Sequence, residues 1–230
     1  MNRIQHLYSS LRKKHGSPRG QWSLWCRRPK TLKEKEQVVI ETVLTQRANW
    51  KNVELAVCNL DGAGNMSLRA IADADREKLS FLIRPSGFYR QKAERLRMLA
   101  RYLLNDCGGM ACIDRIPSGL LREGLLLQNG VGPETADDIL LYAFEQPYFV
   151  VDAYTRRIFS RLGLIKPDWD YDKIQKFFMD NLKDVKGKDK IELFKEYHAL
   201  IVELAKRNCK TKQICEDCLL KRSCSRKKYL

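Results

Sequence analysis

The chain has 230 residues, 44% of them hydrophobic, which is enough for one large folded domain or two smaller lobes. Its formal net charge of +15 favours a polyanionic partner, a nucleic acid or an anionic membrane surface, although excess Lys and Arg also occur on ordinary solubilising surfaces. No apolar run is long enough to cross a bilayer, and the basic N-terminal segment lacks the apolar stretch of a secretory signal, so the composition excludes disordered, membrane-spanning and secreted proteins and predicts an intracellular one.

Helical periodicity dominates the sequence, and no alternating strand pattern of any length is present. Asn49 and Ser67 stand where N-caps are expected, and Pro85 with Gly87 ends a short helix. We therefore predict an all-α fold. In chain order, the expected helices span residues 36–46, 50–60, 67–72, 75–83, 90–104, 118–127, 134–144, 152–162, 171–182 and 190–207.

Two of these helices flank the turn Gly130-Val131-Gly132. Glycine permits positive φ and close approach of a ligand to the backbone, while Val131 can point back into the core. Pro133 suits the first position of the following helix, where its missing N–H has no consequence. The free N–H groups of such a turn are a site for a phosphate. The same pattern is also that of an ordinary αα-hairpin.

An apolar segment ends at Asp152, at the predicted start of the next helix. N-capping is a sufficient reason for an Asp at this position. Capping and catalysis are compatible, because a carboxylate at a helix N-terminus stays ionised and held in one orientation. Such a group can stabilise a cationic reaction centre and position a water molecule.

Four cysteines near the C-terminus have the spacing C-x5-C-x2-C-x5-C: Cys209, Cys215, Cys218 and Cys224. Four thiols so close together in a reducing compartment indicate a metal site, which spacing and ligand type allow to be zinc or a [4Fe–4S] cluster. Four protein ligands leave no open position, so we assign the metal a structural role. The remaining cysteines are interpreted as small core residues or inert thiols: Cys26, Cys58, Cys107 and Cys112.

The stretch GVGPETADDILLYAFEQPYFVVDAYTRRIFSRLG, residues 130–163, resembles the helix–hairpin–helix and Gly/Pro-rich loop-plus-Asp motif of the endonuclease III superfamily of DNA glycosylases. The resemblance implies that Asp152 is catalytic and that Gly130, Val131 and Gly132 grip DNA phosphates. It extends from about Val38 to Cys224 and tips the choice of metal to a [4Fe–4S] cluster. The family's familiar spacing has one more residue in the first gap, so zinc stays an alternative.

Two further segments carry the resemblance. In VLTQRANWKNVE, Gln46 occupies the position of a residue inserted into the DNA gap, and in SGFYRQKAERL, Phe88 sits where a wedge residue enters the base stack. Without the resemblance, Gln46 would be read as a polar helix end and Phe88 as a core aromatic residue. These segments and GPETAD are most similar to the subgroup that includes monofunctional 3-methyladenine DNA glycosylases.

Bifunctional members of the family carry a lysine two positions after the second hairpin glycine, where this chain has Glu134. A carboxylate cannot form the imine on which strand cleavage depends. The resemblance therefore implies a monofunctional glycosylase without AP-lyase activity, which leaves an abasic site. We interpret the neighbouring Asp137 and Asp138 as solvated helix surface.

The expected partner is duplex DNA containing a damaged base, flipped into a pocket of a monomeric protein that has no membrane association. An alkylated purine is the favoured base because it already carries positive charge and leaves easily. The alternatives are uracil, mismatched thymine or an oxidised base, a non-catalytic DNA-binding module, and a lyase that uses another lysine. The expected location is the cytoplasm with the nucleoid, or another intracellular compartment that contains DNA.

Two helical lobes are expected. Residues 31–146 form a six-helix lobe that ends after the hairpin helix, and residues 1–30 with 147–230 form the lobe that contains Asp152 and the cysteines. The expected active site lies in the cleft between the lobes, with Glu134 and Asp152 facing it.

Overall fold

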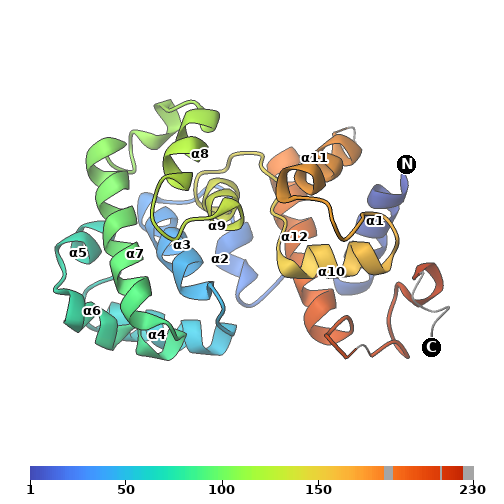
Figure 1. Cartoon of the computed structure of the whole chain (residues 1–230), viewed down its shortest axis with the longest axis horizontal. Helices are drawn as coiled ribbons and strands as arrows, with labels where there is room; N and C mark the ends of the chain where they lie inside the picture. The colour runs from blue at the N-terminus through green and yellow to red at the C-terminus, as the bar shows by residue number, and fades with distance from the viewer. Residues whose placement is uncertain (184–188, 213, 225–230) are drawn as a thin grey trace. The chain divides into compact units, whose positions relative to one another are not determined.

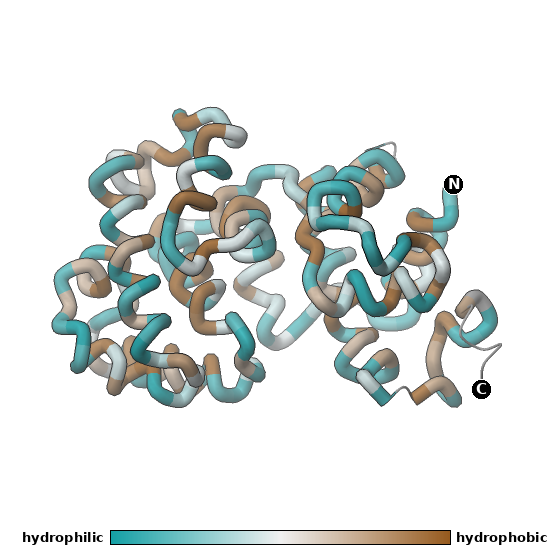
Figure 2. The backbone as a smooth tube through the Cα atoms, in the orientation of Figure 1, coloured by the Kyte–Doolittle hydropathy of each residue, from teal (hydrophilic) through white to brown (hydrophobic). Residues whose placement is uncertain are grey.

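The computed structural model describes residues 1–183, 189–212 and 214–224. Helices and their connections account for all of these residues, and no strand occurs among them (Figure 1), which confirms the all-α prediction. Hydrophilic and hydrophobic stretches alternate along the helices, as expected when each one buries a single face (Figure 2). Within the described ranges, no helix combines the length and the apolar composition needed to span a membrane.

The structure divides into two compact units, of which the first comprises residues 27–146. Its helices begin at side-chain caps: Thr31 forms a capping box with Glu34, and Asn49, Ser67 and Asp75 each accept a hydrogen bond from a first-turn N–H. Its elements are α3 (Leu32–Thr45), α4 (Trp50–Gly62), α5 (Leu68–Asp73), α6 (Arg76–Leu82), η1 (Arg84–Ser86), α7 (Tyr89–Arg101), η2 (Tyr102–Asp106), η3 (Ile113–Arg115), α8 (Ser118–Leu126), α9 (Pro133–Asp138) and η4 (Ile139–Ala143).

The core of this unit forms where α3 packs against η4 and α7 packs against α5 and α6. Ile40 and Leu44 of α3 and Leu140 of η4 are completely buried. The helices predicted over residues 90–104 and 134–144 are present, but each ends in a π-helical turn, η2 and η4. The packing of η4 against α3 anchors α9 and the preceding turn at residues 130–132.

The second unit comprises residues 1–26 and 147–230. An aromatic cluster forms its core: Phe149 stacks on Phe178 with ring centroids 4.3 Å apart, and Phe159, Phe194 and Tyr197 meet these rings edge-on. Its elements are α1 (Arg3–His15), α2 (Trp22–Cys26), α10 (Ala153–Arg161), α11 (Tyr171–Leu182), α12 (Lys190–Arg207) and η5 (Lys221–Ser223). Phe149 fixes the segment that leads to Asp152.

Sequence analysis predicted no helix before residue 36, whereas the structure has α1 and α2 there. The signals for α1 are in the sequence: Asn2 and Gln5 form a capping box, and Ile4 and Leu11 are two members of a regular buried stripe. Tyr8, on the same stripe, donates a hydrogen bond to Glu196 of α12 at 2.6 Å. The N-terminal segment is therefore an integral part of the second unit.

Candidate functional site

Asp152 is the N-cap of α10, as the sequence predicts. Its Oδ1 accepts a hydrogen bond from the Thr155 N–H at 2.6 Å. Val150 and Val151, which precede it, are buried, and Asp152 itself is only 8% exposed. The local sequence therefore delivers one carboxylate in a fixed orientation at the start of a helix.

The second oxygen of Asp152 faces a residue that sequence analysis missed. His198 Nε2 of α12 lies 3.6 Å from Asp152 Oδ2, an ion-pair distance rather than a hydrogen bond. Burial alone would raise the pKa of Asp152, but the contacts with His198 and Thr155 outweigh it and hold that pKa below its ordinary value. Asp152 is consequently a carboxylate at neutral pH.

Lys206, two turns further along α12, also belongs to the electrostatic surroundings of Asp152. Burial lowers the pKa of Lys206, and the charges of Glu203 and Asp152 act in the opposite direction. Its Nζ donates to Gln21 Oε1 at 3.0 Å, and Trp22 Nε1 donates to Glu203 at 3.1 Å. The connection between α1 and α2 and the start of α2 thus complete the polar surroundings of this end of the second unit.

In the first unit, the predicted hairpin joins α8 to α9. Gly130 has φ +79°, and a Cβ added there would lie 2.1 Å from Arg95 Nε of α7. Gly132 has ordinary extended backbone and open space around it, so only one of the two glycines is required for its conformation. Val131 is buried, in agreement with its expected role as the pin of the hairpin.

The side chain of Gln46 is hydrogen-bonded to this hairpin. Its Nε2 donates to the Gly130 carbonyl and to Thr135 Oγ1, both at 3.0 Å, and its Oε1 accepts from Arg95 at 2.9 Å. The end of α3, the middle of α7 and the hairpin therefore meet at one side-chain amide. Arg95 gave no signal in the sequence, because its partners lie far away along the chain.

Phe88 is 54% exposed and has left-handed backbone, with φ 47°. Arg47 shares both properties, and its guanidinium carbon lies 5.9 Å from the centroid of the Phe88 ring. The sequence did not single out Arg47. Two adjacent exposed side chains on strained backbone are a typical feature of a ligand-contacting surface.

A buried lysine holds the backbone beneath this pair. Lys92 is completely buried, and its Nζ donates to the carbonyls of Leu44 and Ser86, each at 2.7 Å. Burial and the nearby charge of Arg95 lower the pKa of Lys92 to about 8. Lys92 therefore fixes the two turns from which Gln46 and Phe88 extend.

Glu134 is exposed in the first turn of α9, where a carboxylate complements the helix dipole. The interpretation of Asp137 as solvated surface was wrong. Asp137 is completely buried and pairs with Arg122 of α8, with its two oxygens 2.7 and 3.1 Å from the guanidinium nitrogens. Asp138 is half-buried. The helical pattern could not distinguish a solvated face from one covered by α8.

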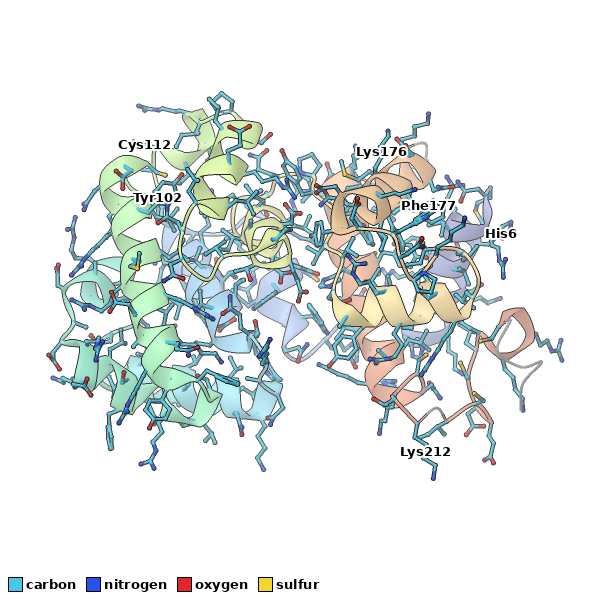
Figure 3. All side chains as sticks on the ribbon, viewed as in Figure 1. His6, Tyr102, Cys112, Lys176, Phe177 and Lys212 are labelled. Carbon is cyan, nitrogen blue, oxygen red and sulfur yellow. The ribbon has the colours of Figure 1, made fainter. Side chains whose placement is uncertain are left out.

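The cysteine loop is attached to α10. Arg161 donates to Cys209 Sγ at 3.1 Å and to the carbonyls of Lys210 and Thr211, and Arg157 donates to the Cys209 carbonyl at 2.8 Å. In Figure 3, the side chain of Lys212 extends away from the ribbon of this loop. The helix that begins at Asp152 therefore ends on the loop that contains the cysteines.

The four cysteines influence one another. Burial raises the pKa of Cys218, and proximity to Cys209, Cys215 and Cys224 raises it further. Within the described ranges, no group of three or more His, Cys, Asp or Glu side chains has the arrangement of a site for a single metal ion. The donor chemistry suits an iron–sulfur cluster, because four thiols lie near one another in one short loop.

The structure thus gathers the predicted residues into two groups. Gln46, Phe88, the hairpin 130–132 and Glu134 belong to the first unit. Asp152 and the four cysteines belong to the second, joined through α10. The structure adds three residues to those predicted from the sequence: His198, Arg95 and Arg47.

The family described as "HhH-GPD superfamily base excision DNA repair protein" matches residues 40–184. This range contains the hairpin and Asp152 and ends before the cysteine loop. A candidate DNA repair glycosylase of Methanocaldococcus jannaschii is 46% identical over 191 residues, which cover 82% of this chain and 84% of that protein. Endonuclease III of Thermotoga maritima is 34% identical over 202 residues, which cover 85% of this chain and 86% of that one.

Solved structures of DNA glycosylases are also similar to this chain. The H. pylori 3-methyladenine DNA glycosylase bound to 1,N6-ethenoadenine has a TM-score of 0.74 and 30% identity, covering 89% of this chain and 97% of that one. A non-covalent endonuclease III–DNA complex has a TM-score of 0.76 at 22% identity, covering 100% of this chain and 98% of the other, and thus shares its fold.

Proposed function

This chain belongs to the HhH-GPD superfamily of base excision DNA repair proteins and is a DNA glycosylase of that family, and we propose that it is a monofunctional enzyme that removes an alkylated purine from duplex DNA and leaves an abasic site. The observation that carries the proposal is the fixed, ionised carboxylate of Asp152. As the N-glycosidic bond breaks, positive charge develops on the sugar. Asp152 stabilises that charge and orients the attacking water.

Glu134 supports hydrolysis without strand cleavage. It stands where the resemblance places the lysine of bifunctional enzymes, and its side chain cannot form an imine with the sugar. Its exposed position in the first turn of α9 is accounted for by the helix dipole. In our proposal, therefore, no covalent enzyme–sugar bond forms at Glu134.

DNA is held by the first unit through the hairpin and the exposed turn. The open surroundings of Gly132 leave its backbone accessible to a phosphate. Phe88 enters the base stack beside the extruded nucleotide, with Arg47 against its ring. Gln46 fills the gap only if it releases its hydrogen bonds to the hairpin and to Arg95, so Phe88 is the better-placed wedge.

The alkylated purine is supported by the H. pylori structural neighbour, whose bound base is 1,N6-ethenoadenine. Separately from that neutral base, a cationic alkylpurine such as 3-methyladenine requires little protonation in order to leave, so it makes few demands beyond a carboxylate and a water molecule. Uracil, mismatched thymine and oxidised bases are the competing substrates.

We further propose that Cys209, Cys215, Cys218 and Cys224 hold a [4Fe–4S] cluster, with zinc as the alternative metal. When bound, the cluster cross-links the C-terminal loop and supplies no open coordination position for chemistry. Lys210, Lys212 and Lys221 make that loop a basic contact for the DNA backbone.

The test is base release from duplex oligonucleotides that each carry one lesion: 3-methyladenine, 1,N6-ethenoadenine, uracil, mismatched thymine or 8-oxoguanine. Wild type and Asp152→Asn are compared with and without a later alkaline step. We expect release of the alkylated adenines that requires Asp152, with strand breaks only after alkali. Strand breaks without alkali would contradict the monofunctional assignment. Tight DNA binding without release of any base would instead indicate a non-catalytic binding module.

A further inference from the structure

We propose that His198 is a positioning residue that acts through Asp152, holding the second carboxylate oxygen in place. The inference rests on the proposed function, since it assigns Asp152 to catalysis. It starts from the unequal surroundings of the two oxygens. Oδ1 is fixed by the Thr155 N–H within its own helix, whereas Oδ2 faces α12, where His198 Nε2 lies 3.6 Å away.

His198 is built into its position. It lies in the middle of α12, an 18-residue helix, and is 4% exposed. Its ring packs edge-on against Trp22 of α2, with centroids 6.0 Å apart and an interplanar angle of 82°. α10 and α12 pack against each other, so the ring of His198 and the carboxylate of Asp152 are supplied by two elements in direct contact. A surface histidine would move with solvent, but this one is held by its neighbours on both sides.

The chemistry of the contact follows from burial. A carboxylate that is removed from water tends to take up a proton unless a cation or an N–H donor compensates for the lost hydration. The Thr155 N–H compensates at one oxygen through a hydrogen bond, and the imidazole lies at ion-pair distance, 3.6 Å, from the other. The charged group Lys206 on α12 acts on Asp152 as well, and it would remain if His198 were removed. His198 therefore contributes a contact from a fixed position on α12.

Two variants of His198 distinguish the contribution of its N–H group from that of its aromatic ring. His198→Phe keeps an aromatic ring against Trp22 and removes the N–H, while His198→Gln keeps an N–H donor and removes the ring. Tyr197→Phe is the matched control, because it deletes one buried hydrogen bond on the same helix, to the Ile4 carbonyl, without touching Asp152.

Base release is measured in single turnovers and DNA affinity is measured separately. We expect His198→Phe to slow base release about 10- to 100-fold, as loss of a supporting contact typically does, with unchanged affinity for lesion DNA. His198→Gln should slow base release less than His198→Phe does. Tyr197→Phe should keep the wild-type rate of base release whatever its thermal stability. Equal losses in the Phe and Gln variants, or a rate that follows stability across all three, would overturn the proposal.

A readout independent of catalysis is the pKa of Asp152 itself, followed by 13C NMR of protein labelled at the Asp carboxyl carbons, with Asp152→Asn identifying the resonance. Removing the His198 contact should raise this pKa, and the Tyr197→Phe substitution should not. An unchanged pKa in His198→Phe would refute the inference even if the enzyme is a glycosylase. A raised pKa in a protein that releases no base would support the contact and reject the proposed function.

Discussion

Single residues decide how rigid the candidate site is. Gly130 is needed both for its left-handed backbone and for the approach of Arg95, while Gly132 is needed for neither. From the sequence these two glycines are equivalent, because each is simply a residue without a side chain in a turn. The distinction requires the position of α7, which no local pattern contains.

Gly130→Ala should therefore destabilise the protein by at least about 1–2 kcal/mol, the cost of placing an L-residue in left-handed backbone, with the contact against Arg95 adding to it. Gly132→Ala is the matched control and should leave the free energy of unfolding unchanged. Urea unfolding of both variants measures the difference. Equal effects of the two substitutions would mean that the hairpin relaxes freely.

Lys92 gives the stability of the protein a specific dependence on pH. Its pKa is about 8 in the folded protein against an ordinary value of 10.5, so between these values the unfolded chain binds more protons than the folded one. The stability contributed by this group should therefore rise as pH rises through that window, and should stay at its lower level below pH 8.

Urea unfolding of wild type and Lys92→Met at both ends of the window tests this expectation. The stability of wild type relative to the variant should increase with pH. The exposed Lys51→Met serves as the control and should show no such trend. A pH-independent difference between wild type and Lys92→Met would show that the lysine titrates normally.

At the scale of elements, the helices were predicted best where a cap and an apolar stripe coincide. Asn49, Ser67 and Asp152 all cap as expected, and residues 171–182 and 190–207 form helices with the predicted bounds. The contacts between elements were not predictable. Asp137 looked like surface because its partner Arg122 belongs to another helix.

The α8–α9 ion pair carries a prediction of its own. Arg122→Ala leaves Asp137 as a buried charge without its guanidinium and should cost about 3–5 kcal/mol of stability. The exposed pair between Lys176 and Asp180 is the comparison, and Lys176→Ala should cost less than about 1 kcal/mol. Thermal or urea unfolding of both variants measures the two costs. A similarly small loss of stability in Arg122→Ala and Lys176→Ala would show that water reaches Asp137.

At the scale of the whole molecule, the net charge of +15 makes DNA binding salt-dependent. The logarithm of the binding constant should fall linearly with the logarithm of salt concentration, by about 0.9 for each phosphate neutralised. Replacing Lys212 and Lys221 by Glu should reduce the slope if the cysteine loop contacts the backbone, and Lys176→Gln should not. Fluorescence anisotropy at several salt concentrations measures the slope, and an unaltered slope in the double variant would remove this loop from the DNA interface.

The all-α class and the family followed from motifs read in order along the chain. The supports of the candidate site did not, because His198, Arg95 and Arg47 reach their partners only after folding. Motifs identify the atoms that meet the substrate, whereas the residues that hold those atoms are specified by packing.

The meeting of Gln46, Arg95 and Gly130 at one amide has a consequence for engineering and for natural variation. Replacing Gln46 removes a partner of both the Arg95 guanidinium and the Gly130 carbonyl, replacing Arg95 removes a donor to Gln46, and a side chain at position 130 collides with Arg95. The effects of substitutions at these three positions on stability are therefore expected to be coupled rather than additive.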